Sequence, residues 1–411
     1  MDLRLANCSI VDAQDPNPRQ QAEVHIHKDR IAWVGPAASA PEFAKARTVD
    51  LEGGYLLPGL VEAHSHLFML HNRLPRPQNV AAHTMYCMVH AVDALKGGFT
   101  GLRILGEGYG VDIALRDTFN QGSIVGPRLW VSGELLTPSG GHVSDRDEFW
   151  GIRVCDGADG WRKAARDQIQ AGADYVKLLI TGGAIGRDYD ITDATTVTEE
   201  EVQAAAQVAH SRRRPLIVHA AAPAGIAMAL RAGAHSIEHG YFLDDTTAEM
   251  IAKSGAYLTP TLTITHMIPS LLEDDYERAA FAAYGRPEWK VKRAEERLEA
   301  HLASFNCALK AGVKILVGSD FAPFPRAGHC EMAFMVKAGL SPWQVIVAAT
   351  RTAAEAVGML GQLGTIEAGK YADLIAVAEN PLEDIRRLRY PKVVLRGGRL
   401  AVNQFNPLEA C

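Results

Sequence analysis

Residues 59–70, GLVEAHSHLFML, form an apolar run that contains two histidines one residue apart, His64 and His66. Successive side chains of a β-strand point to opposite faces, so residues two apart share a face. If the run is a strand, both imidazoles are directed to one point. The same pair is also compatible with two core histidines that each bond to a backbone group, so the rest of the chain has to decide.

Seven more short β-type runs follow, separated by longer Ala-rich helical stretches such as TEEEVQAAAQVAHSRR (198–213), which carries a Thr/Glu helix start. An alternation of strands and helices indicates βαβ units and a parallel sheet, and eight strands predict an α/β fold of the (β/α)8 TIM barrel type. The eight runs are GLVEAHSHL (59–67), FTGLRILG (99–106), PRLWVSG (127–133), YVKLLITGG (175–183), PLIVHA (215–220), SIEHG (236–240), AYLTPTL (256–262) and KILVGSD (314–320).

Both ends of the chain have a different pattern, with short alternating strands and Gly or Asp turns, as in AEVHIHKDRIAWVG (22–35) and KVVLRGGRLAV (392–402). We therefore expect one small β-sandwich domain formed by residues 1–57 and 362–411, and a barrel domain formed by residues 58–361. The segment 267–302 is charged and helical, which suggests a lid or an insertion.

The composition restricts the partners. A net charge of -6 over 411 residues lacks the basic excess that nucleic-acid binding needs. The N-terminal stretch has an acidic residue at once and no apolar run of signal-peptide length, and no later segment is apolar enough to span a bilayer. We expect a cytoplasmic homo-oligomer that acts on a small molecule, with no membrane partner. Six cysteines without a CxxC pair indicate free thiols, so a metal would need N and O ligands.

Polar residues lie at the ends of several predicted strands. The active site of a (β/α)8 barrel is at the C-terminal ends of its strands, so these residues would face one cavity. Imidazole and carboxylate groups suit zinc or a similar divalent ion. The candidate ligands are His64, His66, Lys177, His219, His239 and Asp320.

A second HxH pair, His25 and His27, provides a control within the chain. It has the same alternation but lies in the predicted small domain and leads into a charged turn. We interpret it as an outward-facing pair without a ligand role. The spacing alone is therefore weak evidence, and it gains weight only where the pair begins a barrel whose later strands end in Lys, His, His and Asp.

These motifs resemble those of the metal-dependent amidohydrolase superfamily. LLPGLVEAHSHL (56–67) is similar to its first-strand signature, GSD (318–320) to its eighth-strand aspartate, and LGTIEAGKYADLIAVAENPL (363–382) to its return to the small domain. YVKLLITGG, IVHAAAPAGIAMALRAGAHSIEHG (217–240) and SGGHVSD (139–145) most resemble the prolidase-like branch. That branch cleaves Xaa-Pro or Xaa-Arg/Lys dipeptides and N-acyl amino acids, including ochratoxin-type amides. Its dipeptidases usually read Gly-His-Gly-Asp where this chain has GHVSD.

Lys177 is the unusual member of the ligand set, because an ammonium group cannot bind a cation and is disfavoured when buried beside metals. The resemblance implies that Lys177 reacts with carbon dioxide and forms a carbamate that bridges two divalent ions, with zinc as the expected metal. It also implies that one ion is held by His64, His66 and Asp320 and the other by His219 and His239.

The resemblance further implies hydrolysis of an amide by a hydroxide that bridges the two metals, with Asp320 as the group that moves a proton to the leaving nitrogen. His142 and Tyr241 occupy places where the dipeptidase branch contacts the substrate's carboxylate and the carbonyl under attack, and His142 is counted with Asp320 as catalytic. Arg187 and His329, in predicted loops after the fourth and eighth strands, are further substrate-binding candidates.

Two other readings remain. A mononuclear amidohydrolase, such as an imidazolonepropionase or a deaminase, would not need Lys177. A barrel that has lost catalysis and serves as a scaffold would be expected to lose ligands first, whereas all six ligand positions are occupied here.

Overall fold

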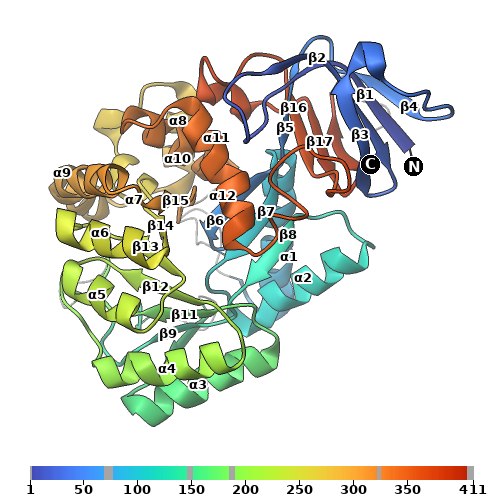
Figure 1. Cartoon of the computed structure of the whole chain (residues 1–411). Coiled ribbons are helices and arrows are strands. Elements are labelled where there is room, and N and C mark those ends of the chain that lie inside the picture. The colour runs from blue at the N-terminus through green and yellow to red at the C-terminus, as the bar shows by residue number, and fades with distance from the viewer. Residues whose placement is uncertain (1, 69–76, 146–150, 185–189, 322–324, 405–411) are drawn as a thin grey trace.

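Parallel strands form the centre of the larger part of the chain (Figure 1). The structure, a computed structural model, describes residues 2–68, 77–145, 151–184, 190–321 and 325–404. Within these ranges a three-stranded parallel sheet consists of β6 (Leu60–Ser65), β7 (Phe99–Ile104) and β8 (Arg128–Val131). A seven-stranded parallel sheet has the order β10 (Ile152–Val154), β9 (Leu135–Thr137), β11 (Val176–Leu179), β12 (Leu216–Ala220), β13 (Ser236–His239), β14 (Tyr257–Thr259) and β15 (Lys314–Ile315).

Each of the eight predicted runs contains one of these strands, namely β6, β7, β8 and β11 to β15. Strands β9 and β10 were not predicted, because each has three residues and is too short to show an alternation. They pair with each other, and β9 also pairs with β11.

Backbone hydrogen bonds connect the two sheets at both borders. The amide of Ala63 in β6 donates to the carbonyl of Val317 at 2.7 Å, and the amide of Asp320 donates to the carbonyl of His64 at 3.0 Å. At the other border the amide of Asp174 donates to the carbonyl of Val131 in β8 at 2.7 Å. This arrangement of parallel strands fits the predicted barrel.

Helices follow the strands and cover their outer side (Figure 1). The predicted Thr/Glu start of α4 is confirmed, because the side chain of Thr198 accepts from the amide of Glu201 and the Glu201 side chain accepts from the Thr198 amide. The helices are α1 (Val80–Lys96), α2 (Val111–Gln121), α3 (Gly157–Ala171), α4 (Glu199–Ser211), α5 (Pro223–Arg231), α6 (Asp245–Ser254), α7 (Thr263–His266), α8 (Asp275–Tyr284), α9 (Glu288–Lys310), α10 (Arg326–Lys337), α11 (Pro342–Ala349) and α12 (Arg351–Ala356).

The segment 267–302 contains α8 and the first part of α9, as its helical pattern predicted. Nε of Arg297 donates to Oγ1 of Thr192 at 3.2 Å, which joins α9 to the chain that follows β11. His301 of α9 lies 2.8 Å from Oγ1 of Thr265 in α7. The segment therefore packs over the C-terminal ends of the strands.

The two ends of the chain contribute strands to one sheet. Its core contains Leu5, Leu56 and Leu374, which lie in a hydrophobic cluster of their own. The described part of this sheet has eight strands, in the order β18 (Arg399–Asn403), β17 (Val393–Arg396), β16 (Leu374–Val377), β5 (Tyr55–Pro58), β1 (Asp2–Ile10), β2 (Arg19–His27) and β3 (Arg30–Pro36), with β4 (Arg47–Asp50) beside β1.

The outward orientation expected for His25 is wrong. Its side chain is buried, its Nε2 lies 2.6 Å from Oε1 of Glu23, and its ring stacks on that of Phe43. The chain that follows β3 covers this face of β2, which the local alternation could not reveal. His27 is exposed as expected and lies 3.0 Å from Oδ1 of Asp2.

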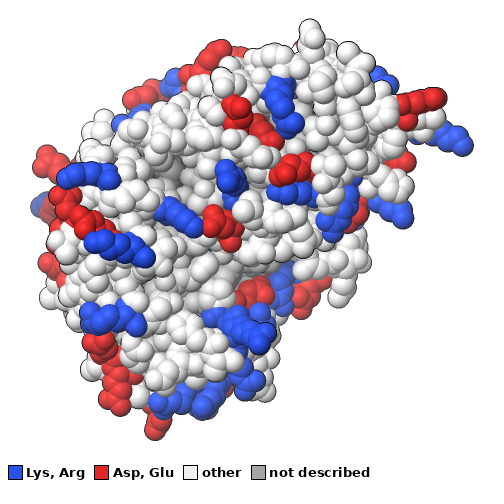
Figure 2. All heavy atoms as spheres, in the orientation of Figure 1, with Lys and Arg blue, Asp and Glu red and all other residues white. Residues whose placement is uncertain are grey.

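Figure 2 shows Lys and Arg side chains interspersed with Asp and Glu over the face in view, in keeping with the small net charge of -6. Among the helices that the structure describes, none combines the length and the apolar character needed to cross a bilayer.

Candidate metal centre and active site

The C-terminal ends of the parallel strands surround a cavity of about 570 Å³. All six candidate ligands predicted from the sequence line it, together with the substrate candidates His142 and Tyr241. Its apolar wall is formed by Leu135, Val143, Leu179, Ala184 and Ile264.

His64 is held by a buried carboxylate. Its Nδ1 lies 2.6 Å from Oε2 of Glu238 in β13, so Nδ1 carries the proton and donates, and the lone pair of Nε2 is directed to the cavity. Glu238 also accepts a hydrogen bond from Nη2 of Arg103 at 2.8 Å. Burial alone would raise the pKa of Glu238, but the charges of Arg103 and His64 hold this pKa below its ordinary value.

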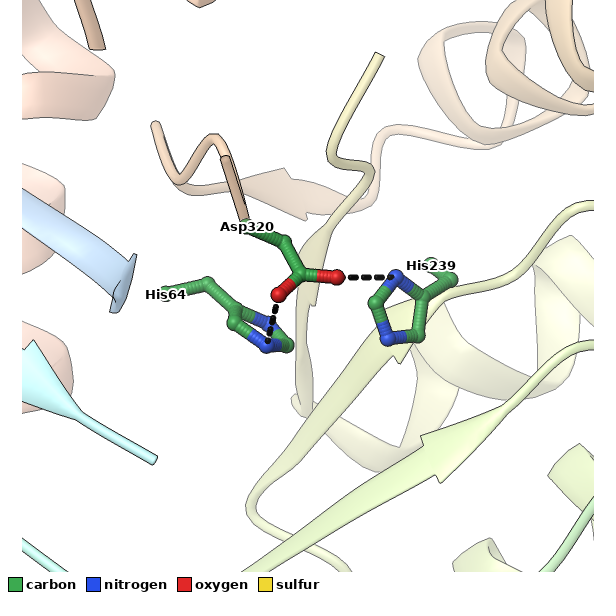
Figure 3. A group of neighbouring side chains, drawn as sticks. All are labelled: His64, His239 and Asp320. Atoms are coloured by element: carbon green, nitrogen blue, oxygen red, sulfur yellow. Dashed lines mark ion pairs between the residues drawn. The ribbon is translucent and has the colours of Figure 1, made fainter. Parts of the chain in front are cut away.

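Asp320 lies between the imidazoles of His64 and His239 (Figure 3). Its Oδ1 is 3.5 Å from Nε2 of His64, its Oδ2 is 4.0 Å from Nδ1 of His239, and one ligand atom from each residue lies within 4.8 Å of the others. His66 joins the group, because its Nε2 is 3.1 Å from Oδ1 of Asp320 while its Nδ1 donates to the carbonyl of Gly106 at 3.2 Å.

The backbone is left-handed at two of these positions, with φ of 75° at His239 and 49° at Asp320. Such conformations are uncommon for residues other than glycine and occur often at functional sites. The left-handed conformation sets the direction of the His239 side chain at the end of β13. Its Nδ1 lies 2.8 Å from Oγ1 of Thr261 and 3.2 Å from the hydroxyl of Tyr241. Because these contacts engage Nδ1, Nε2 of His239 is the atom suited to bind a metal.

His219 and His142 lie face to face, with ring centroids 4.8 Å apart. Nε2 of His219 donates to the carbonyl of Gly182 at 3.1 Å, which makes Nδ1 the nitrogen with a lone pair. Nδ1 of His142 lies 2.5 Å from Oδ2 of Asp190. Gly183 is required beside this pair, because a Cβ atom there would lie 1.9 Å from the His142 ring.

Val143, which follows His142 and lines the cavity, also has a left-handed backbone, with φ of 56°. A β-branched residue is strained in this conformation.

Lys177 is 2% exposed, and its Nζ has no hydrogen-bond partner in the part of the chain that the structure describes. Burial lowers the pKa of Lys177 to about 8, against the opposing effects of Glu238 and Asp320. A buried amine of this kind, facing imidazoles and a carboxylate, is left with unmet bonding capacity.

The imidazoles of His64, His219 and His239 favour their neutral, metal-binding form. Burial, followed by the nearby positive groups, lowers the pKa of His219 and His239 well below the ordinary value. Burial also lowers the pKa of His64. For Asp320, burial alone would raise the pKa, but His64 and His66 lower it, so the carboxylate stays ionised. These donors therefore fit a divalent cation in charge and in kind.

One of the substrate candidates, His329, does not line the cavity. His329 lies in helix α10 rather than in a loop, and it is buried away from the site, where Nε2 donates to the carbonyl of Gly97 at 3.0 Å and Nδ1 accepts from the hydroxyl of Tyr276 at 2.7 Å. The prediction that His329 faces a substrate is therefore corrected. Arg187 lies outside the described residues.

The sequence reading missed the carboxylates that hold the ligands in place. Besides Glu238, Glu62 accepts from the hydroxyl of Ser319 at 2.8 Å, next to Asp320. Glu331 accepts from the amides of Leu262 and Thr263 at 2.8 and 2.7 Å, next to the Thr261 that contacts His239. A signal was present for Glu62, which interrupts the apolar start of its strand run, GLVEA (59–63).

Comparisons with known proteins give the family of this chain. The profile described as the amidohydrolase family matches residues 55–401. Ochratoxinase from Aspergillus niger is 30% identical over 94% of this chain and 84% of its own length. The crystal structure of that ochratoxinase superposes with a TM-score of 0.82 at 26% identity, covering 98% of this chain and 96% of the other.

Two further crystal structures are similar over almost the whole chain. A Xaa-Pro dipeptidase with bound methionine in the active site gives a TM-score of 0.85 at 27% identity, covering 97% of this chain and 99% of the other. A prolidase complexed with N-methylphosphonate-L-proline gives 0.85 at 28% identity, covering 98% and 100%.

The chain thus belongs to the amidohydrolase family, a family of hydrolases. Within that family, its similarity to the ochratoxinase and the prolidases confirms the branch that the sequence motifs indicated.

Proposed function

We propose that the protein is a binuclear metal-dependent hydrolase that cleaves the amide bond of dipeptides or N-acyl amino acids. The observation that carries this proposal is the convergence of the four candidate ligand imidazoles, one carboxylate and one buried amine, which has no hydrogen-bond partner among the described residues, in a single cavity. A cavity that gathers an ionised carboxylate and several neutral imidazoles is typical of a site that binds a metal cation.

In this proposal one ion is held by His64, His66 and Asp320, the other by His219 and His239. Lys177 would be present as a carbamate, whose two oxygens would bridge the ions. The orphaned Nζ of Lys177 supports this modification, because the neutral amine is the form that reacts with carbon dioxide and burial favours that form.

When bound, the ions would supply electrophilic activation of water and of the amide carbonyl. Asp320 would accept a proton at Oδ2 and deliver it to the leaving nitrogen. The carboxylate remains ionised beside His64 and His66, so it is available as the base. Glu238 and Thr261 would orient His64 and His239 through their Nδ1 atoms.

The substrate would carry a free carboxylate next to the amide that is cleaved. His142 and Tyr241 line the cavity and are the polar groups proposed to contact that carboxylate and the carbonyl under attack. Leu135, Leu179 and Ile264 offer apolar contacts to the rest of the molecule. The names of the similar proteins, a Xaa-Pro dipeptidase and an ochratoxinase, support an amide of an amino acid.

We also propose that the two parallel sheets close into a (β/α)8 barrel over residues 58–361. The hydrogen bonds of Ala63 and Asp174 across the borders of the sheets support closure. Residues 1–57 and 362–411 would form the small domain as a β-sandwich, supported by their separate hydrophobic cluster.

The proposal is tested by elemental analysis and by a pair of matched substrates. The purified protein should hold close to two divalent ions in the cavity and lose activity when they are chelated. An N-acyl amino acid should be cleaved with a much higher kcat/KM than the same compound with its carboxylate blocked as an amide. An active preparation with only trace metal would refute the metal requirement, and equal kcat/KM values would refute the carboxylate preference.

A mononuclear amidohydrolase remains the second candidate, and Lys177 separates the two. Lys177→Ala should lose metal and activity, and formate or acetate should restore part of both by filling the vacated space. In a mononuclear enzyme Lys177→Arg would be nearly silent. Full activity of Lys177→Arg would therefore favour the mononuclear mechanism.

A further inference from the structure

A second group of metal-binding side chains lies outside the cavity. It consists of His83, Cys87 and Glu107, whose ligand atoms all lie within 4.8 Å of one another. Nε2 of His83 is 2.8 Å from Oε1 of Glu107, and Sγ of Cys87 is 3.8 Å from the same nitrogen. Each of the three residues is at most 1% exposed, so the group is closed to solvent.

The fold sets the positions of these three residues before any ligand binds. His83 and Cys87 are four apart in α1, so they share one face of the helix. Glu107 follows β7, and its carboxylate is fixed by two backbone amides, those of Phe68 at 2.9 Å and Gly108 at 3.3 Å. The carboxylate of Glu107 therefore bonds both to the chain before β7, at Phe68, and to the chain after β7, at Gly108.

The charges around this group favour a cation. In the described part of the chain, no Lys or Arg side chain forms an ion pair with Glu107, whose partner is His83. Asp112 is a second fully buried carboxyl, close enough to Glu107 for the two groups to interact electrostatically. The buried region thus gathers two carboxyl groups and a thiol around one imidazole.

We propose that His83, Cys87 and Glu107 bind one divalent ion of the zinc type at a structural site separate from the catalytic cavity. An imidazole, a thiolate and a carboxylate form a donor set typical of zinc. The ion would displace the thiol proton of Cys87 and the proton shared by His83 and Glu107. Ligands of a tetrahedral zinc ion are about 3.3–3.5 Å apart, so the spacings of 2.8 and 3.8 Å need only small shifts.

An ion at this site would help to position a residue of the catalytic cavity, His66. Glu107 is bonded in sequence to Gly106, whose carbonyl accepts the hydrogen bond from Nδ1 of His66 at 3.2 Å. An ion bound at Glu107 would stiffen this stretch of backbone and, through it, the orientation of His66.

Cobalt(II) distinguishes this site from the cavity, because thiolate ligation gives a near-ultraviolet charge-transfer absorption that nitrogen and oxygen ligands do not give. The ligands proposed for the cavity contain no sulfur. Protein loaded with excess cobalt(II) should hold close to three ions per chain and show this absorption. The same absorption is expected in Lys177→Ala, so the result does not depend on the proposed catalytic centre.

Cys87→Ser should abolish the charge-transfer absorption and lower the cobalt content by one ion, whereas Cys330→Ser, at an equally buried helical cysteine, should change neither. If Cys87→Ser does not fold, Cys87→Ala replaces it, because alanine leaves no buried hydroxyl. Cadmium-113 NMR of the wild-type chain provides a reading that needs no variant, since sulfur ligation moves the resonance strongly downfield. The proposal is overturned if the wild-type chain gives no sulfur-ligated signal, or if that signal persists without Cys87.

Discussion

The imidazole of His64 and the carboxylate of Glu238 meet through a 2.6 Å contact between Nδ1 and Oε2, which joins strand β6 to strand β13. Both side chains are at most 2% exposed, and Glu238 is also the partner of the buried Arg103. The contact therefore fixes the tautomer of a proposed metal ligand and neutralises a buried guanidinium at the same time. Loss of the carboxylate charge would disturb both functions.

Glu238→Gln should lower the free energy of unfolding by roughly 3–5 kcal/mol, because it leaves the charge of Arg103 buried without its partner. It should also weaken metal binding about 10- to 100-fold, since the amide orients His64 less firmly. Urea unfolding and metal titration measure the two effects. Glu199→Gln is the control, because the pair of Glu199 with Arg231 is exposed and its loss should leave the unfolding midpoint unchanged.

Asp320→Asn should keep most of the bound metal and lose roughly two or more orders of magnitude in kcat. Asparagine has nearly the same shape and still offers an oxygen, but it cannot accept a proton. Elemental analysis and steady-state kinetics on the same preparation separate the two functions. Turnover at the wild-type rate would remove Asp320 from proton transfer.

Lys177 should make the stability of the metal-free, bicarbonate-free protein depend on pH. The pKa of Lys177 is about 8 in the folded chain, against an ordinary value of 10.5. Between these values the unfolded chain binds a proton that the folded chain does not. The free energy of unfolding should therefore rise with pH across this window, by about 1.4 kcal/mol per pH unit at most.

Lys177→Met should lack this contribution, so the difference between the two unfolding curves isolates it from all other titrating groups. Below pH 8 the methionine variant should be the more stable of the two, by about 3 kcal/mol. Parallel pH profiles for the two proteins would show that Lys177 keeps its ordinary basicity in the folded chain.

Asp190→Asn tests the proposed role of His142 in substrate binding. Oδ2 of Asp190 lies 2.5 Å from Nδ1 of His142, and this contact holds the imidazole in one orientation at the wall of the cavity. The variant should raise KM about tenfold for a substrate with a free carboxylate and leave metal content unchanged. A carboxylate-blocked substrate is the matched comparison, and an equal rise in its KM would contradict the assignment.

The strand-end positions of His64, His66, His219 and Asp320 could be predicted, because a barrel strand directs its last side chains to the cavity whatever the rest of the chain does. The structure brings them together as that rule requires. Glu238 could not be assigned a partner in this way. Its contacts with His64 and Arg103 join residues 174 and 135 positions apart in the chain, and no local pattern records such a pairing.

His329 shows where local reasoning failed. Its distance from the strand end at Asp320 suggested a loop, but α10 begins at Arg326 and turns the imidazole toward Gly97 and Tyr276. His25 failed for a related reason, since packing of Phe43 on its ring buries a side chain that alternation alone would leave outside. In both cases the deciding neighbour is remote in sequence.

The left-handed backbone of Val143 has a consequence for how this enzyme could be reshaped. A branched side chain in that conformation costs on the order of 1–2 kcal/mol, and the chain accepts the cost at the wall of its cavity, where φ is 56°. Glycine adopts the same conformation without strain, so a chain with glycine here would gain space beside His142 and lose little or no stability. Variation at this one position could therefore widen the cavity without any change to the proposed metal ligands, and position 143 is the first target for altering which molecules the cavity admits.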